Sequence, residues 1–162
     1  MTYTADEGAV SAVFQLDDAV EKLRIGTTLA DLVAPDTRTE GRFGLYRWNL
    51  NANSPGAPSA HFHRNFSESF YIFDGTIHLY DGASWRAAEQ GDFMYVPEGG
   101  VHGFRNISDA PASMLIMFAP GAPREDYFRA LADIITNGKT LTPEEWTELY
   151  ARHDQYMVDV ST

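Results

Sequence analysis

The hydrophobic and polar positions between Lys22 and about Met117 follow a short, repeated pattern. Brief runs rich in Val, Ile, Phe, Tyr and Thr are separated by Gly, Pro, Asp and Asn. This pattern is typical of an antiparallel all-β domain. We expect roughly eight to ten strands, in the segments KLRIGTTLADLV, RFGLYRWNL, ESFYIF, TIHLYDGASWRAA, DFMYVP, HGFRNI and SMLIMFA.

A hairpin is expected within the fourth of these segments. Asp81 and Gly82 lie between two β-prone arms. The glycine accepts the positive φ that tight turns require, so the two arms are predicted to pair with each other.

After residue 120 the pattern changes to helical spacing. In PREDYFRALADIITNGK, apolar residues recur every three or four positions, and Asn137-Gly138 is typical of a C-terminal cap. In LTPEEWTELYARHDQY, Thr142 is the expected N-cap, Pro143 the first helical residue and Glu145 the partner that completes a capping box. Two α-helices are therefore predicted near the C-terminus.

Three regions follow from this reading. Residues 1–21 form an N-terminal extension, residues 22–120 the β-domain, and residues 121–162 a helical extension. Each predicted helix has one apolar face and cannot be stable alone, so we expect the extension to pack on the β-domain or on a second subunit. Whether it covers the mouth of the domain or contacts a partner is open, as is the role of residues 1–20.

Composition narrows the range of functions. The formal net charge of −11 disfavours nucleic acid and anionic lipid as partners. The chain has no cysteine, which excludes disulfides, thiol catalysis and thiolate-bound metal. Its most apolar run, SMLIMFAPG, is too short to span a bilayer. We expect a soluble, cytoplasmic protein without membrane contact.

The segment SAHFHRNFSESFYIFDG contains a candidate metal site. In a strand, His61 and His63 would face the same way, with Cα atoms about 6.5–7 Å apart. If RNFS forms a bend, a strand that begins at Glu68 would bring its carboxylate back to the same point. The glycines and proline of GDFMYVPEGGVHGFRN would aim His102 inward as a fourth ligand.

These two segments resemble the paired motifs of the cupin superfamily. The first motif, G(x)5HxH(x)3-4E(x)6G, is matched by its two histidines, its glutamate and Gly75, whereas Pro55 stands where the opening glycine is expected and Gly56 follows one residue later. The second, G(x)5PxG(x)2H(x)3N, is matched in full by Gly91, Pro97, Gly99, His102 and Asn106. The resemblance covers roughly residues 22–120.

The resemblance implies a double-stranded β-helix, a jelly-roll barrel, that holds one divalent metal on His61, His63, Glu68 and His102. Three imidazoles and a carboxylate suit Fe, Mn, Ni, Zn or Cu and leave one or two sites open. Such a centre has a net charge of about +1 and favours an anionic, chelating oxygen ligand. Glu68 could also act as a catalytic base. The alternative is a metal-free barrel with hydrogen-bonded core histidines.

Alternation along the strands suggests which residues surround the substrate. Phe70 and Ile72 share the face of Glu68, and Phe104 and Asn106 share that of His102, so these four are substrate-binding candidates. Ordinary core packing is the alternative for each of them. Two arginines, Arg47 and Arg105, could meet an anion or be solvated, and two further histidines, His78 and His153, are expected to be structural.

Among single-domain cupins, the chain most resembles the bacterial quercetinase-type dioxygenases, on the segments AHFH, FYI, VPEGGVHGF and FAPGAPREDYFRALAD. This resemblance implies a metal-dependent dioxygenase or related oxidoreductase that acts on a small aromatic or enolisable substrate. Two alternatives remain: a non-oxidative metalloenzyme, such as an isomerase, cyclase or lyase, and a non-catalytic small-molecule binder. The same resemblance leads us to expect a homodimer.

Overall fold

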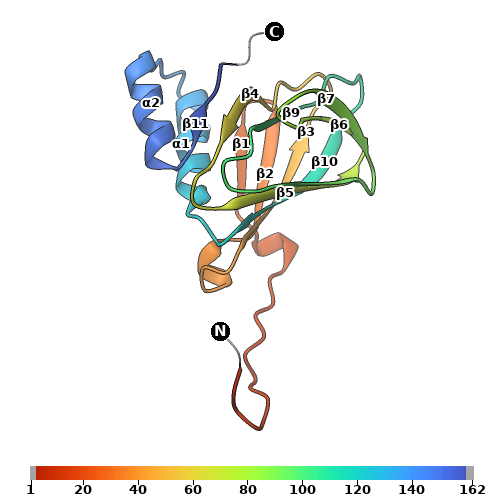
Figure 1. Cartoon of the computed structure of the whole chain (residues 1–162), viewed down its shortest axis with the longest axis vertical. Coiled ribbons are helices and arrows are strands. Elements are labelled where there is room, and N and C mark those ends of the chain that lie inside the picture. Colours follow the sequence, from red (N-terminus) through yellow and green to blue (C-terminus); the bar gives the residue numbers. More distant parts are fainter. Residues whose placement is uncertain (1–2, 160–162) are drawn as a thin grey trace.

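The computed structural model describes residues 3–159 and consists of two β-sheets packed face to face, with two helices at one end (Figure 1). One sheet has the strand order β1-β2-β3-β10-β5-β8 and the other β11-β4-β9-β6-β7. The all-β prediction is confirmed, and the arrangement is that of a double-stranded β-helix barrel. The strands are β1 Lys22–Ile25, β2 Thr28–Ala34, β3 Gly44–Leu50, β4 Ala57–Phe62, β5 Ser67–Asp74, β6 Thr76–Tyr80, β7 Trp85–Glu89, β8 Phe93–Val96, β9 His102–Arg105, β10 Ala112–Ala119 and β11 Tyr156–Met157.

The core lies between the sheets because the strands alternate as their sequences predict. Along β3, every second residue is buried, and the inward residues are Tyr46, Trp48 and Leu50. The adjacent strand β10 contributes Met114, Ile116 and Phe118 in the same way. These side chains form much of the core between the two sheets.

Both predicted helices are present, as α1 Arg124–Thr136 and α2 Pro143–Arg152. The capping box at Thr142 is formed in both directions, which confirms the predicted start of α2. The apolar face of α1 lies on the barrel of its own chain, where Phe128 contacts Tyr46 and Trp48 edge to face. No helix within residues 3–159 has the length and apolarity needed to cross a membrane.

The predicted hairpin joins β6 to β7, but it has a longer loop than a two-residue turn. Tyr80 pairs with Trp85, and the Asp81 carboxylate accepts hydrogen bonds from the backbone N–H groups of Ala83 and Ser84. Gly82 has a φ of +90°, the positive value for which a glycine was expected.

Two features differ from the sequence-based expectation. The described residues form eleven strands, one more than the upper estimate, because the two-residue strand β11 pairs with β4 after helix α2. Strand β4 ends at Phe62, so His63 lies just beyond it. Short 3-10 helices also occur at Asp17–Ala19 and Asp36–Arg38.

Candidate metal centre

Three neighbouring segments of the barrel bring His61, His63, Glu68 and His102 together. His61 is on β4 and pairs directly with His102 on β9, while Glu68 is near the start of β5 in the opposite sheet. One potential ligand atom from each residue lies within 4.8 Å of those of the other three. All four side chains are at most 4% exposed. The convergence expected from the spacing of the motifs is therefore present.

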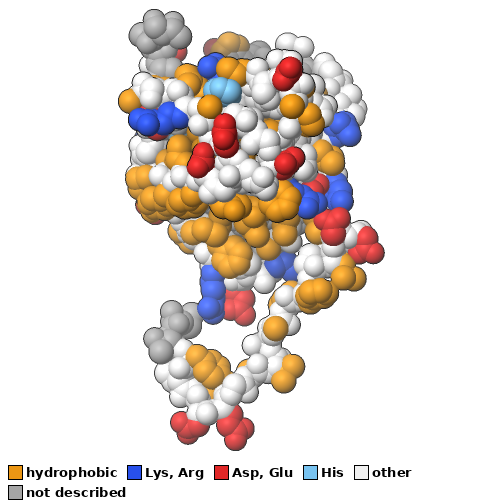
Figure 2. Space-filling view, turned by 90° about the vertical axis from the view of Figure 1, so that its right-hand side faces the viewer, with side chains coloured by type: hydrophobic (Ala, Val, Ile, Leu, Met, Phe, Trp, Pro, Cys, Tyr) orange, Lys and Arg blue, Asp and Glu red, His pale blue; other side chains and the backbone are white. Residues whose placement is uncertain are grey.

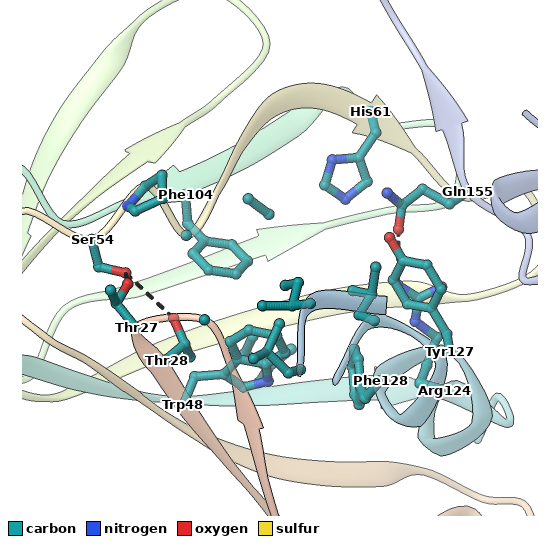
Figure 3. A pocket seen from close by; sticks show the side chains of 18 of the residues that line it. Thr27, Thr28, Trp48, Ser54, His61, Phe104, Arg124, Tyr127, Phe128 and Gln155 are labelled. Carbon is teal, nitrogen blue, oxygen red and sulfur yellow. Dashed lines mark hydrogen bonds between the residues drawn. The ribbon is translucent and has the colours of Figure 1, made fainter. Parts of the chain in front are cut away.

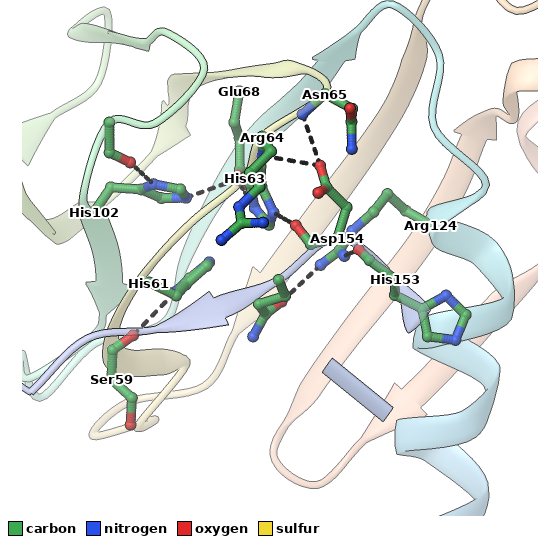
Figure 4. A network of polar contacts seen from close by, with 12 residues as sticks. Ser59, His61, His63, Arg64, Asn65, Glu68, His102, Arg124, His153 and Asp154 are labelled. Carbon is green, nitrogen blue, oxygen red and sulfur yellow. Dashed lines mark hydrogen bonds and ion pairs between the residues drawn. The ribbon is translucent and has the colours of Figure 1, made fainter. Parts of the chain in front are cut away.

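The carboxylate of Glu68 is the centre of the cluster (Figure 4). Its Oε2 atom lies 2.7 Å from Nε2 of His102 and 3.1 Å from Nε2 of His63. The imidazole of His61 lies beside that of His102, with ring centroids 4.4 Å apart.

Backbone carbonyl groups fix the tautomers of the three imidazoles. The Nδ1 atoms contact Ser59 O at 3.0 Å for His61, Gly100 O at 3.0 Å for His102 and Asp154 O at 2.6 Å for His63. A carbonyl oxygen can only accept a hydrogen bond, so each Nδ1 must carry the proton. Each Nε2 then faces the cluster and can bind a metal once it has lost any proton shared with Glu68, which is the orientation that metal-binding histidines adopt in proteins.

The protonation equilibria of the cluster favour an ionised glutamate. Burial alone would raise the pKa of Glu68, but the charge of His102 and the hydrogen bonds from His102 and His63 lower it below its ordinary value. Burial would lower the pKa of His102, and the attraction of Glu68 outweighs this and raises it. Burial, together with repulsion from His102, lowers the pKa of His61 to about 3.

The fit of these residues to a metal can be judged from their donor set. Three oriented imidazole nitrogens and one carboxylate form a buried set of the type that binds divalent transition metals. A metal bound there would displace the protons that now lie between Glu68 and the two histidines, because ligand nitrogens must be deprotonated. The donor set does not select one metal from the expected group.

The C-terminal segment supports the centre, a contribution that the sequence reasoning missed. Asp154 follows α2 with a φ of +54° and directs its carbonyl to His63. Its carboxylate Oδ2 accepts hydrogen bonds from the backbone N–H groups of Arg64, at 3.0 Å, and Asn65, at 2.8 Å. The only sequence signal was an Asp in a segment that follows a helix, which does not reveal a partner 91 residues away.

A cavity of about 180 Å³ opens from the metal centre toward helix α1 (Figure 3). His61 and Glu68 line it on one side, and Thr28 and Ser54, whose hydroxyl groups are hydrogen-bonded to each other, lie at another end. The remaining wall is mainly apolar and aromatic, and it includes Trp48, Phe104, Ile116, Phe118, Tyr127, Phe128, Leu131 and Ile135.

The four substrate-binding candidates occupy different places. Phe104 lines the cavity. Phe70 and Ile72 are completely buried in the core and are not among the residues that line it. The Asn106 side chain is also completely buried, and its amide donates hydrogen bonds to the carbonyl groups of Asn51 and Ala110, which closes the loop after β9.

The arginines considered from the sequence lie away from the cavity. Arg47 pairs with Asp31 and Asp17, and Arg105 stacks on Trp85 with its guanidinium 4.0 Å from the ring centroid. The arginine that does line the cavity is Arg124, the first residue of α1. Arg124 lies on the same face of α1 as Tyr127 and Leu131. Continuing the predicted apolar face by one turn toward the N-terminus would therefore have identified it as a residue that faces the barrel.

Comparison with known proteins agrees with the fold. Residues 47–118 match the family model described as Cupin domain. Quercetin 2,3-dioxygenase from Bacillus subtilis (strain 168) is 27% identical over 129 residues, which make up 78% of this chain and 36% of that protein. The chain therefore spans only about a third of the length of this relative.

Solved structures give the same result at lower identity. The polyketide cyclase RemF from Streptomyces resistomycificus superimposes with a TM-score of 0.58 at 18% identity, over 69% of this chain and 82% of that one. A predicted oxalate decarboxylase from Thermotoga maritima gives a TM-score of 0.60 at 16% identity, over 67% of this chain and 99% of that one.

The fold, the buried cluster and these matches together define a cupin barrel with a site suited to a metal ion. Residues 47–118 of the chain form a cupin domain. The two structures above bear the names of a cyclase and a predicted decarboxylase, and the Bacillus subtilis relative bears that of a dioxygenase. The fold is shared among these reactions, so the reaction must be argued from the site.

Proposed function

We propose that this protein is a metal-dependent dioxygenase or a related oxidoreductase that acts on a small aromatic or enolisable molecule. The observation that carries the proposal is the cluster of three histidines and one glutamate at the wall of an apolar, aromatic-lined cavity. The sequence similarity to a quercetin dioxygenase favours the oxidative reaction within this class.

The residues of the chain suit this reaction in defined ways. A divalent metal on His61, His63, Glu68 and His102 would supply a Lewis acid and, when it is redox-active, a means of activating dioxygen. Glu68 is the carboxylate of the cluster, so it is the group that could accept the proton of a substrate hydroxyl or enol. The aromatic wall would exclude water and position the ring or chain of the substrate.

The same centre could support non-oxidative chemistry. An isomerase, cyclase or lyase would use the metal to stabilise an enolate, with Glu68 in the same role as base. Two structural neighbours are named as a cyclase and a predicted decarboxylase, and these names favour retaining this alternative. A binding protein without turnover would use the cavity alone.

Elemental analysis followed by oxygen uptake tests the proposal. Protein purified without chelator is expected to contain about one transition metal per chain, since the chain offers one such cluster among its described residues. After reconstitution with iron, nickel, manganese or cobalt, at least one form should consume oxygen with a panel of catechols and flavonols. The zinc-loaded protein is the control, because zinc has no redox chemistry.

The outcomes separate the three classes. Oxygen uptake that the Glu68→Gln variant loses supports the dioxygenase. Substrate conversion without oxygen uptake, in the zinc form as well, would replace it with the non-oxidative enzyme. Saturable binding without turnover for every metal would support the binding protein.

The remaining parts of the proposal concern the cellular setting. We propose that the protein works in the cytoplasm as a homodimer and that its partner is a small-molecule substrate. The net charge of −11 supports the absence of nucleic-acid and membrane partners. Cell fractionation tests the location.

A further inference from the structure

Arg124 is a buried cation that has no salt-bridge partner among residues 3–159; the carboxylates of Glu68 and Asp154 attract it without hydrogen-bonding to it. Its side chain is 4% exposed, and its Nη1 and Nη2 groups donate to the carbonyl of His153 at 2.8 Å and to Oε1 of Gln155 at 2.9 Å. Both acceptors are neutral, and its Nε–H has no partner among the described residues. The adjacent acid, Glu125, instead accepts a hydrogen bond from Tyr46.

Aromatic rings supply part of the missing stabilisation. The guanidinium carbon lies 4.4 Å from the ring centroid of Tyr127, 5.3 Å from that of Phe118 and 5.5 Å from that of Phe128. Cation–π contacts are weaker than a hydrogen-bonded ion pair, and an uncompensated buried charge is strongly unfavourable. Burial accordingly lowers the pKa of Arg124 below its ordinary value. A bound anion would complete this environment.

The position of Arg124 connects it to the metal centre. Arg124, Tyr127 and Gln155 line the same cavity as His61 and Glu68 (Figure 3). A dication on three neutral imidazoles and one carboxylate has a net charge of about +1, and Arg124 adds a second positive charge to the cavity wall. With such a metal bound, the cavity would be positive although the whole chain is strongly acidic.

The volume of the cavity limits the size of its ligand. Its volume of about 180 Å³ is close to the roughly 150 Å³ of an engineered cavity that binds benzene. It is below the roughly 300–1,000 Å³ typical of pockets for drug-sized ligands. A single ring or short chain fits, whereas a three-ring flavonol would require the cavity to widen.

We propose that the cavity selects a single-ring or short-chain carboxylate, with the carboxylate on the guanidinium of Arg124 and the opposite end facing His61 and Glu68. This inference rests on the proposed function, because it takes the same cavity as the substrate site. Arg124 is then a specificity-determining residue for the reaction. Its hydrogen bonds to His153 and Gln155, in the segment between α2 and β11, hold the guanidinium in place.

Calorimetric titration of the metal-free and zinc-loaded protein with benzoate and its neutral isostere benzamide tests the proposal. Benzoate should bind at least about tenfold more tightly than benzamide in both forms, as expected for one charge-assisted hydrogen-bonded pair. Arg124→Gln should bind the two probes equally while keeping its affinity for benzamide, and Arg124→Lys should retain part of the preference. Arg129→Gln, on the same helix but paired at the surface with Glu21, is the matched control and should behave as wild type.

Equal affinities for the two probes in the wild type, or an unchanged preference in Arg124→Gln, would overturn the proposal. If Arg124→Gln does not fold, the ¹⁵N resonance of the Arg124 Nε–H group in the wild type decides: it should shift with benzoate and not with benzamide, and a static resonance overturns the assignment. Benzoate and benzamide do not react, and zinc has no redox chemistry. The binding result is therefore independent of the oxygen-uptake test. A protein that does not consume oxygen could still show the predicted preference for benzoate.

Discussion

At the scale of single residues, the site depends on which nitrogen of each imidazole carries the proton. Carbonyl oxygens of Ser59, Gly100 and Asp154 fix Nδ1 as the donor in all three rings. This leaves three Nε2 atoms facing one carboxylate. Two of the carbonyls come from residues two positions before their histidine, so the local backbone orients these rings, while the third comes from the C-terminal segment.

The lowered pKa of His61 predicts acid sensitivity in the metal-free protein. Its folded-state pKa of about 3 lies below its ordinary value of 6.5, so the unfolded state binds more protons between these values. The stability contributed by neutral His61 is complete above pH 6.5 and falls by about 1.4 kcal/mol per pH unit as the pH decreases toward 3. Urea unfolding with chelator present, at pH 6.5 and 4.5, should show this loss.

His61→Gln provides the comparison for that measurement. The variant lacks the titrating group but keeps His102, whose raised pKa acts in the opposite direction in both proteins. Its stability should fall less than that of the wild type over the same interval. Parallel losses in the two proteins would contradict the lowered pKa.

A second prediction at this scale concerns Asp154. Its carboxylate holds the turn that contains Arg64 and Asn65, and its carbonyl orients His63. Asp154→Ala should weaken zinc affinity about tenfold, the lower end of the effect of removing outer-shell partners. Asp154→Asn should preserve it, because an amide oxygen accepts the same bonds and Asn tolerates positive φ. Competition with a chromophoric chelator measures both, and wild-type affinity in Asp154→Ala would refute this role.

At the scale of elements, helix α1 supplies the arginine and two of the aromatic side chains that line the cavity. It begins with Arg124 and presents Tyr127 and Phe128 to the barrel. A buried hydrogen bond from Tyr46 on β3 to the Glu125 carboxylate fixes the start of the helix, and that carboxylate also accepts from the backbone N–H of Asp36 at 3.3 Å. Docking of α1 therefore depends on polar as well as apolar contacts.

Removing the Tyr46 hydroxyl should weaken this docking. Tyr46→Phe leaves a buried carboxylate oxygen short of a donor, and we expect a loss of about 1–3 kcal/mol in unfolding free energy. Tyr80→Phe is the matched control, since its hydroxyl donates to Gly82 at an exposed loop and its removal should change little. Urea denaturation of both variants measures the difference. Equal stability of the two variants would show that the bond does not anchor α1.

The elements also show how far the sequence could predict the structure. Strand alternation predicted the all-β domain, and the resemblance of the two motifs to those of cupins implied the barrel and the meeting of the four residues His61, His63, Glu68 and His102. The spacing within each motif is local, whereas the pairing of β4 with β9 that joins the two motifs is long-range. The capping box at Thr142 was also local. Strand β11 was not predictable, since two residues have no periodicity and its pairing with β4 depends on the preceding helices. Asp154 reaches the site in the segment between α2 and β11, and Arg124 reaches it through the docking of α1 on the barrel.

At the scale of the whole molecule, the outer face of the larger sheet is unusually aromatic. Tyr71 and Phe73 on β5 and Phe93 and Tyr95 on β8 are between 44% and 63% exposed. Figure 2 shows a band of hydrophobic side chains across this side of the body. Contiguous exposed apolar surface of this kind commonly marks an interface. The face therefore supports the proposed homodimer.

Light scattering tests this proposal. The wild type should have about twice the mass of one 18.1 kDa chain. The double variant Phe73→Lys and Phe93→Lys should be a monomer, because charges on the face oppose its burial. Ile135→Lys, at an exposed position of α1, is the control and should remain a dimer. A compact monomer for the wild type would contradict the proposal.

We propose that four side chains, from the two sheets of one barrel, bind a single metal ion. Anomalous diffraction from crystals grown with zinc, recorded on both sides of the zinc absorption edge, tests it most directly. We predict one strong peak per chain, about 2.0–2.2 Å from the Nε2 atoms of His61, His63 and His102 and from a carboxylate oxygen of Glu68. A barrel with no peak at this point, or with zinc bound elsewhere, would contradict the account.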